Sequence, residues 1–143
     1  MQSIKIKKLN EKAVIPKYQT SGAAGFDFHS TDDVVIMPGD TALVGTGLAF
    51  AVPELFELQV RPRSGLSAKT GLRVANAPGT VDSDYRGEVK IILTNTGFVP
   101  QHIRVGDRIA QGVLCPVYQA DFWEVQELDS TERGSGAFGS TDK

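Results

Sequence analysis

Short runs of alternating apolar and polar residues recur along the chain, and they constrain its fold more than any other feature. Alternation with period two is typical of half-buried β-strands. The runs are residues 4–6, 26–28, 34–37, 56–60, 89–93 and 108–114. Turn-forming sequences separate them, including Pro38-Gly39-Asp40, Pro78-Gly79, Arg86-Gly87 and Val105-Gly106-Asp107. This spacing predicts an all-β fold, a distorted jelly-roll or β-sandwich domain, rather than βαβ units.

One short helix and a distinct C-terminal segment complete the predicted organisation. The helix is expected over about residues 65–70, with Ser64 as its N-cap and Gly71 at its end. Residues 129–143 consist of Ser, Thr, Gly and charged residues, with Phe138 as the large apolar exception. We therefore expect a β domain over residues 1–128, followed by a flexible, glycine-rich lid over residues 129–143.

Length, charge and cysteine content narrow the class of protein. The 143 residues suit one compact domain. The chain has fifteen Lys and Arg residues and seventeen Asp and Glu residues, and the lack of a basic excess argues against polymeric nucleic acid as a partner. The single cysteine, Cys115, permits no intrachain disulfide, and the N-terminal sequence lacks the apolar run of a signal peptide or membrane span. These features predict a cytoplasmic location and no membrane association.

The segment from Asn76 to Gly87 gathers acidic residues, an aromatic residue and glycines in one turn between two predicted strands. A hairpin of this composition can form a pocket. Asp82 and Asp84 are candidates for chemistry, although both are equally typical of Asx turns. An EF-hand calcium loop is excluded, because Arg86 and Leu93 fall where oxygen ligands belong.

The sequence Arg61-Pro62-Arg63-Ser64-Gly65 leads from a predicted strand into the helix. The Arg63 guanidinium and the free N–H groups of the first helical turn would suit a phosphate. The alternative is a simple N-cap followed by a solvated arginine. A P-loop is rejected, because Ala68 stands where a glycine must precede the lysine.

Three further segments carry polar residues of uncertain role. Asp27 lies in an apolar strand, so its carboxylate must be hydrogen-bonded, lie near a cation or face solvent. The turn before Gln111 is read either as part of a site or as a structural turn with an Asp107–Arg108 surface ion pair. The tail sequence from Arg133 to Thr141 combines glycines and hydroxyls with Phe138, which could stack on a base or belong to a disordered terminus.

Taken together and in order, these segments resemble the five motifs of the trimeric dUTPase family. The matching segments are Ala24-Gly25-Phe26-Asp27-Phe28, Arg63-Ser64-Gly65-Leu66, residues 79–87, residues 106–111 and residues 133–141. The resemblance spans nearly the whole chain. It implies hydrolysis of dUTP to dUMP and pyrophosphate, which limits uracil incorporation into DNA and supplies dUMP for dTMP synthesis.

The resemblance implies a role for each matching residue. Asp82 would orient and deprotonate the water that attacks the α-phosphorus, and Tyr85 would pack under the deoxyribose and exclude a 2′-hydroxyl. Asn76 and the backbone after Gly79, including Val81, would read the uracil edge. The other residues implied to bind substrate, mainly its phosphates, are Arg63, Ser64, Gly65, Gln111, Arg133, Gly139, Ser140 and Thr141.

The family also implies a cofactor and an assembly. Asp27 would hold Mg²⁺ through water while the three phosphates chelate the ion. Phe138 would close over the uracil as part of a lid that excludes bulk water. The working unit would be a homotrimer with active sites shared between subunits. Three positions depart from the family pattern: Thr80, Ala137 and Asp142, the last of which places an acid beside the γ-phosphate.

Two alternative functions remain at this level. A dCTP deaminase, or a bifunctional deaminase and pyrophosphatase, would share the fold but would need a catalytic acid beside the cytosine amino group. A non-catalytic binding or signalling protein would keep the fold without needing turnover. Asp82 and Tyr85 favour the pyrophosphatase.

Overall fold

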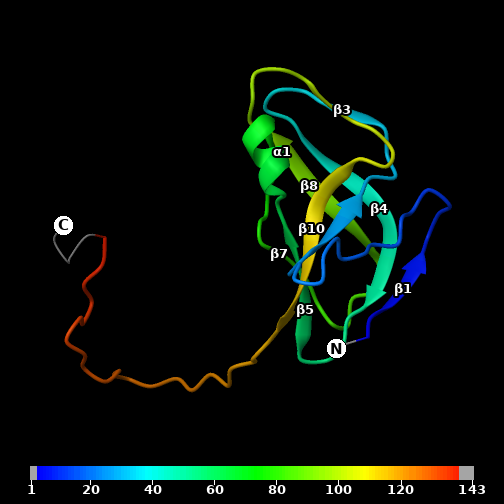
Figure 1. Cartoon of the computed structure of the whole chain (residues 1–143). Coiled ribbons are helices and arrows are strands. Elements are labelled where there is room, and N and C mark those ends of the chain that lie inside the picture. The colour runs from blue at the N-terminus through cyan, green and yellow to red at the C-terminus, as the bar shows by residue number, and fades with distance from the viewer. Residues whose placement is uncertain (1–2, 139–143) are drawn as a thin grey trace.

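The computed structural model describes residues 3–138, which form two four-stranded antiparallel sheets and a small two-stranded sheet (Figure 1). The first sheet has the order β1 (Lys5–Lys8), β4 (Thr41–Ala51), β8 (Glu88–Asn95) and β6 (Leu72–Val74). The second has the order β2 (Phe26–His29), β10 (Arg108–Pro116), β5 (Phe56–Arg61) and β7 (Gly79–Val81). Strand β3 (Val34–Ile36) pairs with β9 (Gln101–Ile103). The predicted all-β class is confirmed, and two packed sheets are consistent with a jelly roll.

The core lies between the two four-stranded sheets and contains a group of aromatic rings. Phe28 of β2 meets Phe50 of β4 edge to face, with ring centroids 5.9 Å apart, so this contact joins the two sheets. Phe26 packs on both rings. Gly112 of β10 leaves room for them, because a Cβ there would lie 2.6 Å from the Phe26 ring. The strands that carry the polar groups described below are thus fixed from behind by a closely packed core.

The helix begins one residue earlier than the sequence predicts. Helix α1 spans Ser64–Lys69, with Arg63 in the N-cap position and no side-chain cap hydrogen bond. Ser64 as N-cap was therefore wrong: Arg63 keeps an extended backbone while its side chain reaches Asp27, and the helix starts directly after it. Thr70, not Gly71, ends the helix. A glycine is needed at position 71 because Gly97 approaches closely: a Cβ added at Gly71 would lie 2.4 Å from the Gly97 nitrogen.

The segment before β8 is not a hairpin. Strand β7 pairs with β5 in the second sheet, whereas β8 pairs with β4 and β6 in the first. Residues 82–87 therefore cross from one sheet to the other. The prediction of a hairpin was wrong because strands that follow each other in sequence find their partners elsewhere, through pairing between distant parts of the chain.

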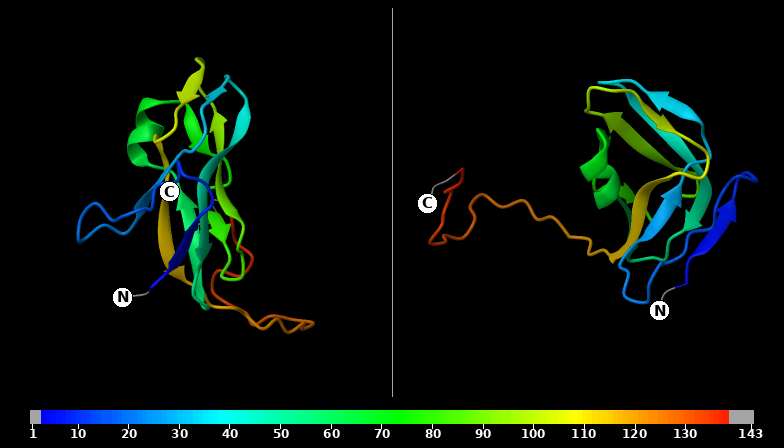
Figure 2. Two further views of the ribbon diagram at one scale, coloured as in Figure 1. Left: turned by 90° about the vertical axis from the view of Figure 1, so that its right-hand side faces the viewer. Right: turned by 45° about the horizontal axis from the view of Figure 1, so that its top comes forward.

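The chain leaves the β domain after β10. The Val117 N–H donates to the Leu55 carbonyl at 2.8 Å, and the hydrogen bonds of the described residues beyond it all lie within the tail. The right-hand view of Figure 2 shows this segment extending away from the sheets. Its large apolar side chains are mostly or fully exposed: Tyr118, Phe122, Trp123, Leu128 and Phe138. Within the described residues, no helix is long and apolar enough to cross a membrane.

Candidate functional site

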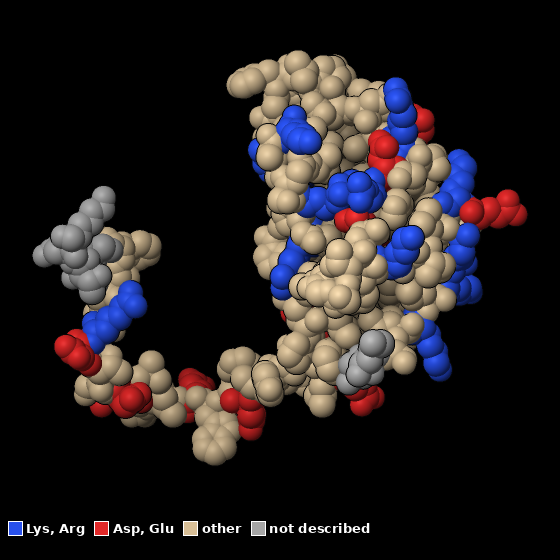
Figure 3. All heavy atoms as spheres, in the orientation of Figure 1, with Lys and Arg blue, Asp and Glu red and all other residues tan. Residues whose placement is uncertain are grey.

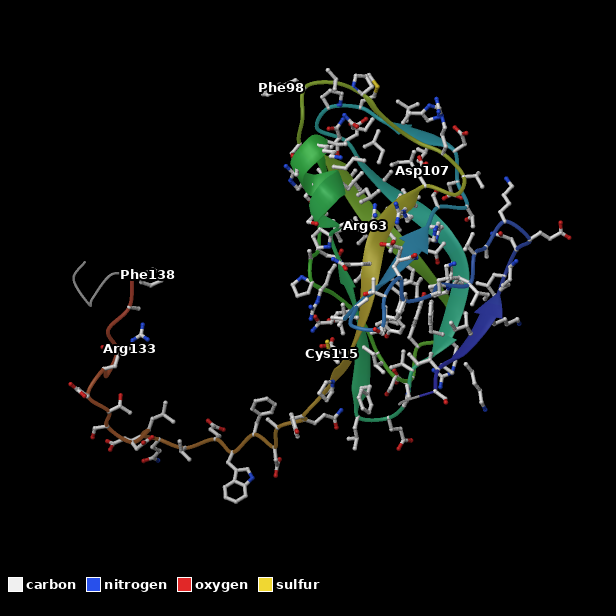
Figure 4. The ribbon with its side chains drawn as sticks, in the orientation of Figure 1. Arg63, Phe98, Asp107, Cys115, Arg133 and Phe138 are labelled. Carbon is white, nitrogen blue, oxygen red and sulfur yellow. The ribbon has the colours of Figure 1, made fainter. Side chains whose placement is uncertain are left out.

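Two arginines hold the Asp27 carboxylate on the outer face of the second sheet. Arg63 Nε lies 2.7 Å from Asp27 Oδ1, and Arg108 Nη1 lies 3.2 Å from Asp27 Oδ2. The Asp27 side chain is only 14% exposed. Of the possibilities left open for Asp27, the nearby cation is therefore the one observed. In Figure 3, blue atoms gather around a small red area on this face, where Figure 4 labels Arg63.

Strand pairing explains why these residues meet. Asp27 stands opposite Gln111 on β10, and Gln111 stands opposite Arg61 on β5. Because side chains two residues apart share a face, Asp27 and His29 both project from the outer side of β2. Arg108 is the register partner of His29, so β10 begins with its arginine beside Asp27.

Of the two alternatives for the turn before Gln111, this geometry argues against the surface ion pair between Asp107 and Arg108. The Asp107 carboxylate instead accepts a hydrogen bond from the Arg104 N–H at 2.8 Å, which closes the turn around Gly106 with its φ of +89°. Arg108 turns to Asp27, which is 81 residues away in the sequence. Sequence reasoning missed this role of Arg108, because only the pairing of β2 with β10 reveals it.

The arginines keep donors available for a ligand. Arg63 uses Nε for Asp27 and Nη1 for the Arg108 carbonyl at 3.1 Å. A guanidinium has five N–H donors, so three remain on Arg63. Two guanidinium groups and one carboxylate give the cluster a net positive charge, which suits an anion with several oxygens. We call Asp27, Arg63 and Arg108 the arginine cluster.

His29 lies beside the arginine cluster, and its charged form is disfavoured there. Burial lowers the pKa of His29 below its ordinary value of 6.5, the Asp27 carboxylate opposes this shift, and Arg108 and Arg63 reinforce it. The buried Nδ1 atom has no hydrogen-bond partner among the described residues, so a proton there would be an unpaired buried donor. Sequence reasoning gave His29 no role beside Asp27, because its position beside the two arginines depends on the pairing of β2 with β10.

Gln111 supports the loop that carries Arg63. Its Nε2 donates to the Pro62 carbonyl at 2.8 Å, and its Oε1 would lie 2.9 Å from a Cβ at Gly25. Gly25 therefore allows the glutamine side chain to lie flat against β2. Ser64 and Gly65 follow Arg63 in the first turn of α1 and are exposed. The structure thus places Arg63, Ser64, Gly65 and Gln111 around one loop.

Asp82 lies outside the arginine cluster, in the crossing between the sheets. It is exposed, and within residues 3–138 neither its carboxylate nor that of Asp84 accepts a hydrogen bond, so nothing supports the Asx-turn alternative. Asp82 borders two pockets of about 570 Å³ each. One is lined by Glu57, Thr80 and Ser83 among others, and the second by Tyr85 and Lys90 among others.

Tyr85 is held against the chain by a glycine. Its hydroxyl donates to the Glu88 carbonyl at 3.0 Å, and a Cβ at Gly87 would lie 2.4 Å from that hydroxyl. Asn76 precedes β7 in the sequence, and its side chain lies against Gly79. A Cβ added at Gly79 would be 3.0 Å from the side-chain nitrogen of Asn76. Gly79 and Val81 are buried, so a ligand beside β7 would meet mainly their backbone atoms. The peptide bond between Ala77 and Pro78 is cis.

The tail residues lie far from the site residues of the same chain. Arg133 Nε donates to the Gly136 carbonyl at 2.9 Å, so it closes a local turn of the tail. Figure 4 shows Arg133 and Phe138 well separated from Arg63. The predicted ligands Gly139, Ser140 and Thr141, and the departure Asp142, lie outside the described residues.

Asp82 and the arginine cluster of one chain are also apart. Asp27 is level with Gln111 and Arg61 across the sheet, whereas Val81 pairs with Leu58, which lies three residues before Arg61. In addition, three strand spacings separate β7 from β2. Strand spacings of about 4.8 Å and rises of about 3.3 Å per residue put Val81 roughly 17 Å from Asp27. One chain therefore presents two half-sites, and neither contains all the predicted groups.

The arginine cluster is compatible with Mg²⁺ held through water. Both Asp27 oxygens already bind arginines, so direct coordination would have to break an ion pair. A hydrated Mg²⁺ needs only hydrogen bonds from its waters, and each carboxylate oxygen keeps a second lone pair. Within residues 3–138, no three potential His, Cys, Asp or Glu ligands converge, as a site made by the protein alone would require.

A positively charged cluster on a two-sheet β scaffold is typical of proteins that bind phosphorylated ligands, and comparison with known proteins specifies the family. The dUTPase family model matches residues 11–142. The deoxyuridine 5'-triphosphate nucleotidohydrolase of Nautilia profundicola is 57% identical over 98% of this chain and 99% of its own. That of Helicobacter hepaticus is 58% identical over 96% of this chain and 87% of its own. The chain belongs to the dUTPase family.

Solved structures agree with this assignment. The Staphylococcus bacteriophage 80alpha dUTPase with dUPNHPP superposes with a TM-score of 0.91 at 27% identity, over 99% of both chains. A variant dUTPase from phage phi11 of S. aureus, whose structure reveals the coordination of a structural Mg(II) ion, gives a TM-score of 0.83 at 25% identity. It covers 88% of this chain and 98% of that one.

Proposed function

We propose that this protein hydrolyses dUTP to dUMP and pyrophosphate by attack of water on the α-phosphorus. The observation that carries this proposal is membership of the dUTPase family over residues 11–142, combined with an anion-binding arginine cluster at the matching positions. The reaction would limit uracil incorporation into DNA and supply dUMP. We further place it in the cytoplasm, because the single cysteine permits no intrachain disulfide.

Asp82 would be the general base. It is exposed at the border of two pockets, and its carboxylate accepts no hydrogen bond from the described residues, so the carboxylate is available to a water. Such a base must lie within hydrogen-bond reach of the proton it takes. Tyr85, fixed over Gly87, would form the floor under the deoxyribose and leave no room for a 2′-hydroxyl. Asn76 and the backbone near Gly79 and Val81 would read the uracil.

The arginine cluster would receive the triphosphate. Three free donors on Arg63, together with Ser64 and Gly65 at the start of α1, supply hydrogen bonds for phosphate oxygens. Asp27 would hold the waters of Mg²⁺, and the ion, when bound, would supply positive charge to offset the charge that develops on the phosphates. Gln111 would keep Arg63 in place through Pro62.

The active unit would be a homotrimer whose sites are completed between subunits. Asp82 and Asp27 must act on the same triphosphate, yet the strand register separates their half-sites within one chain by roughly 17 Å. The tail that carries Arg133 and Phe138 extends away from its own domain. Bringing half-sites and tails of three copies together would supply every predicted group. The tail residues beyond Phe138 would add the remaining phosphate ligands.

Pyrophosphate release from dUTP, compared with release from dCTP, dTTP and UTP, tests this function. We expect rapid release from dUTP with Mg²⁺, much less from the other nucleotides, and loss of activity when the metal is chelated. Deamination of dCTP, or binding of dUTP without turnover by the wild-type protein, would instead support one of the alternative functions.

A further inference from the structure

Arg108 lies in the matching segment of residues 106–111, but the family resemblance assigned it no role in the proposed reaction. Its guanidinium is half exposed, while the Asp27 carboxylate that it contacts is only 14% exposed. It reaches Asp27 Oδ2, the oxygen that Arg63 does not use. Arg108 also offers its backbone carbonyl to Arg63 Nη1. One residue thus contacts both partners of the Asp27–Arg63 pair.

We propose that Arg108 is a positioning residue for binding of the Mg²⁺–triphosphate complex, and that it acts through Asp27. This inference rests on the proposed function. With both oxygens bound to different arginines, the carboxylate cannot rotate, so its remaining lone pairs keep fixed directions toward the waters of the ion.

Without Arg108, Asp27 has one cationic partner and can turn to form a bidentate pair with Arg63. The carboxylate would then no longer direct its free lone pairs toward the waters of the ion. Because the effect passes through Asp27, it should depend on the presence of Mg²⁺ and of the complete triphosphate.

Binding of the non-hydrolysable analogue dUpNHpp, measured by calorimetry with Mg²⁺ and with EDTA, tests this inference without relying on turnover. We expect Arg108→Gln to weaken binding with Mg²⁺ about tenfold, and to change binding with EDTA, or binding of dUMP, much less. Arg104→Gln is the matched control, because Arg104 lies in the adjacent turn and makes hydrogen bonds there through its backbone N–H and carbonyl, not through its side chain.

A double-mutant cycle with Asp27→Asn decides the mechanism. If Arg108 acts through Asp27, Arg108→Gln adds little to the loss caused by Asp27→Asn. Losses that simply multiply would show that Arg108 binds phosphate directly, and would overturn the inference, as would unchanged binding in Arg108→Gln. Arg108→Lys, which keeps the charge, replaces Arg108→Gln if that variant does not fold. Failure of the wild-type protein to bind dUpNHpp would instead reject the proposed function.

Discussion

The arginine cluster and the C-terminal segment differ in how far the folded chain organises them. Each oxygen of Asp27 has an arginine partner, and the strands beneath are fixed by the aromatic core. From Tyr118 to Phe138 the chain has no helix or strand, and its largest side chains are exposed. The fold thus builds the proposed phosphate site in advance and leaves the predicted lid unattached to its own domain.

This contrast suggests a division of labour. A prearranged charged cluster binds without the entropic cost of ordering its side chains, whereas a detached segment can close after the substrate has entered. Asp82 stands between these extremes, because it belongs to the β domain but its carboxylate accepts no hydrogen bond from residues 3–138. The following predictions test the contrast from the largest expected effect to the smallest.

Replacing Asp82 with Asn should separate chemistry from folding most clearly. Turnover of dUTP should fall by at least about a hundredfold, since general-base catalysis contributes about 10² to 10⁴. Binding of dUpNHpp and the melting temperature should stay nearly unchanged, because Asp82 is exposed. Steady-state kinetics and calorimetry measure the two effects. Near-wild-type turnover in a pure sample would exclude Asp82 as the base.

Co-expression of two inactive chains tests whether the lid serves a neighbour. One chain carries Asp82→Asn with its tail, and the other keeps Asp82 but ends after Asp129. Mixed trimers would contain sites that combine an intact Asp82 with a neighbour's tail, so activity should return to about a quarter of the wild-type value for equal random mixing in a three-fold assembly. If each chain used its own tail, mixed trimers identified by mass would stay as inactive as their parents.

Tyr85 and the glycine beneath it should control sugar selection. Trimming Tyr85 to Ala should lower the dUTP preference over UTP by about tenfold, because the wall against the 2′-hydroxyl is removed. Gly87→Ala should act in the same direction, since its Cβ would lie 2.4 Å from the Tyr85 hydroxyl and must displace the ring. Gly22→Ala is the matched control, because nothing lies within 4 Å of its added Cβ. The ratio of specificity constants is measured, and an unchanged ratio in both site variants would reject this role.

His29 should make a small, pH-dependent contribution to stability. Because the pKa of His29 is lowered in the folded protein, the unfolded chain takes up the proton first as pH falls below about 6.5. Stability should therefore decrease between pH 7 and 5, and the decrease should be smaller in His29→Asn. Denaturant unfolding at several pH values provides the test, and equal slopes for both proteins would contradict it.

The sequence predicted the strands in which apolar and polar residues alternate. It did not predict contacts that depend on strand pairing, or a strand that is buried continuously. Residues in β2, β5, β8 and β10 alternate, and all four strands form. The longest strand, β4, was not among the runs identified, because residues 44–50 are buried without alternation and a bulge interrupts its pairing after Gly45. Gly45 and Gly47 there donate backbone hydrogen bonds to Asp32 and Glu88, distant contacts that no local pattern contains.

The site shows the same limit. Asp27 and Arg63 could be identified as candidates from local motifs, and the structure brings them together. Arg108 could not be paired with Asp27 from the sequence, because that contact depends on two strands at opposite ends of the domain sequence. Whether Asp82 faces the same substrate could not be derived either, since the half-sites of one chain do not meet.

The tail is attached to the β domain at Val117, which is held by its hydrogen bond to Leu55. In the proposed trimer, this attachment would determine how specific activity changes when the enzyme is diluted. The chain from Val117 to Phe138 is long enough to extend about 70 Å, and a flexible chain of that length samples about 25 Å on average. Within a trimer, such a tether would keep each lid near a neighbouring site at an effective concentration of about a millimolar. Specific activity should therefore be independent of enzyme concentration until the subunits themselves dissociate, and should then fall steeply.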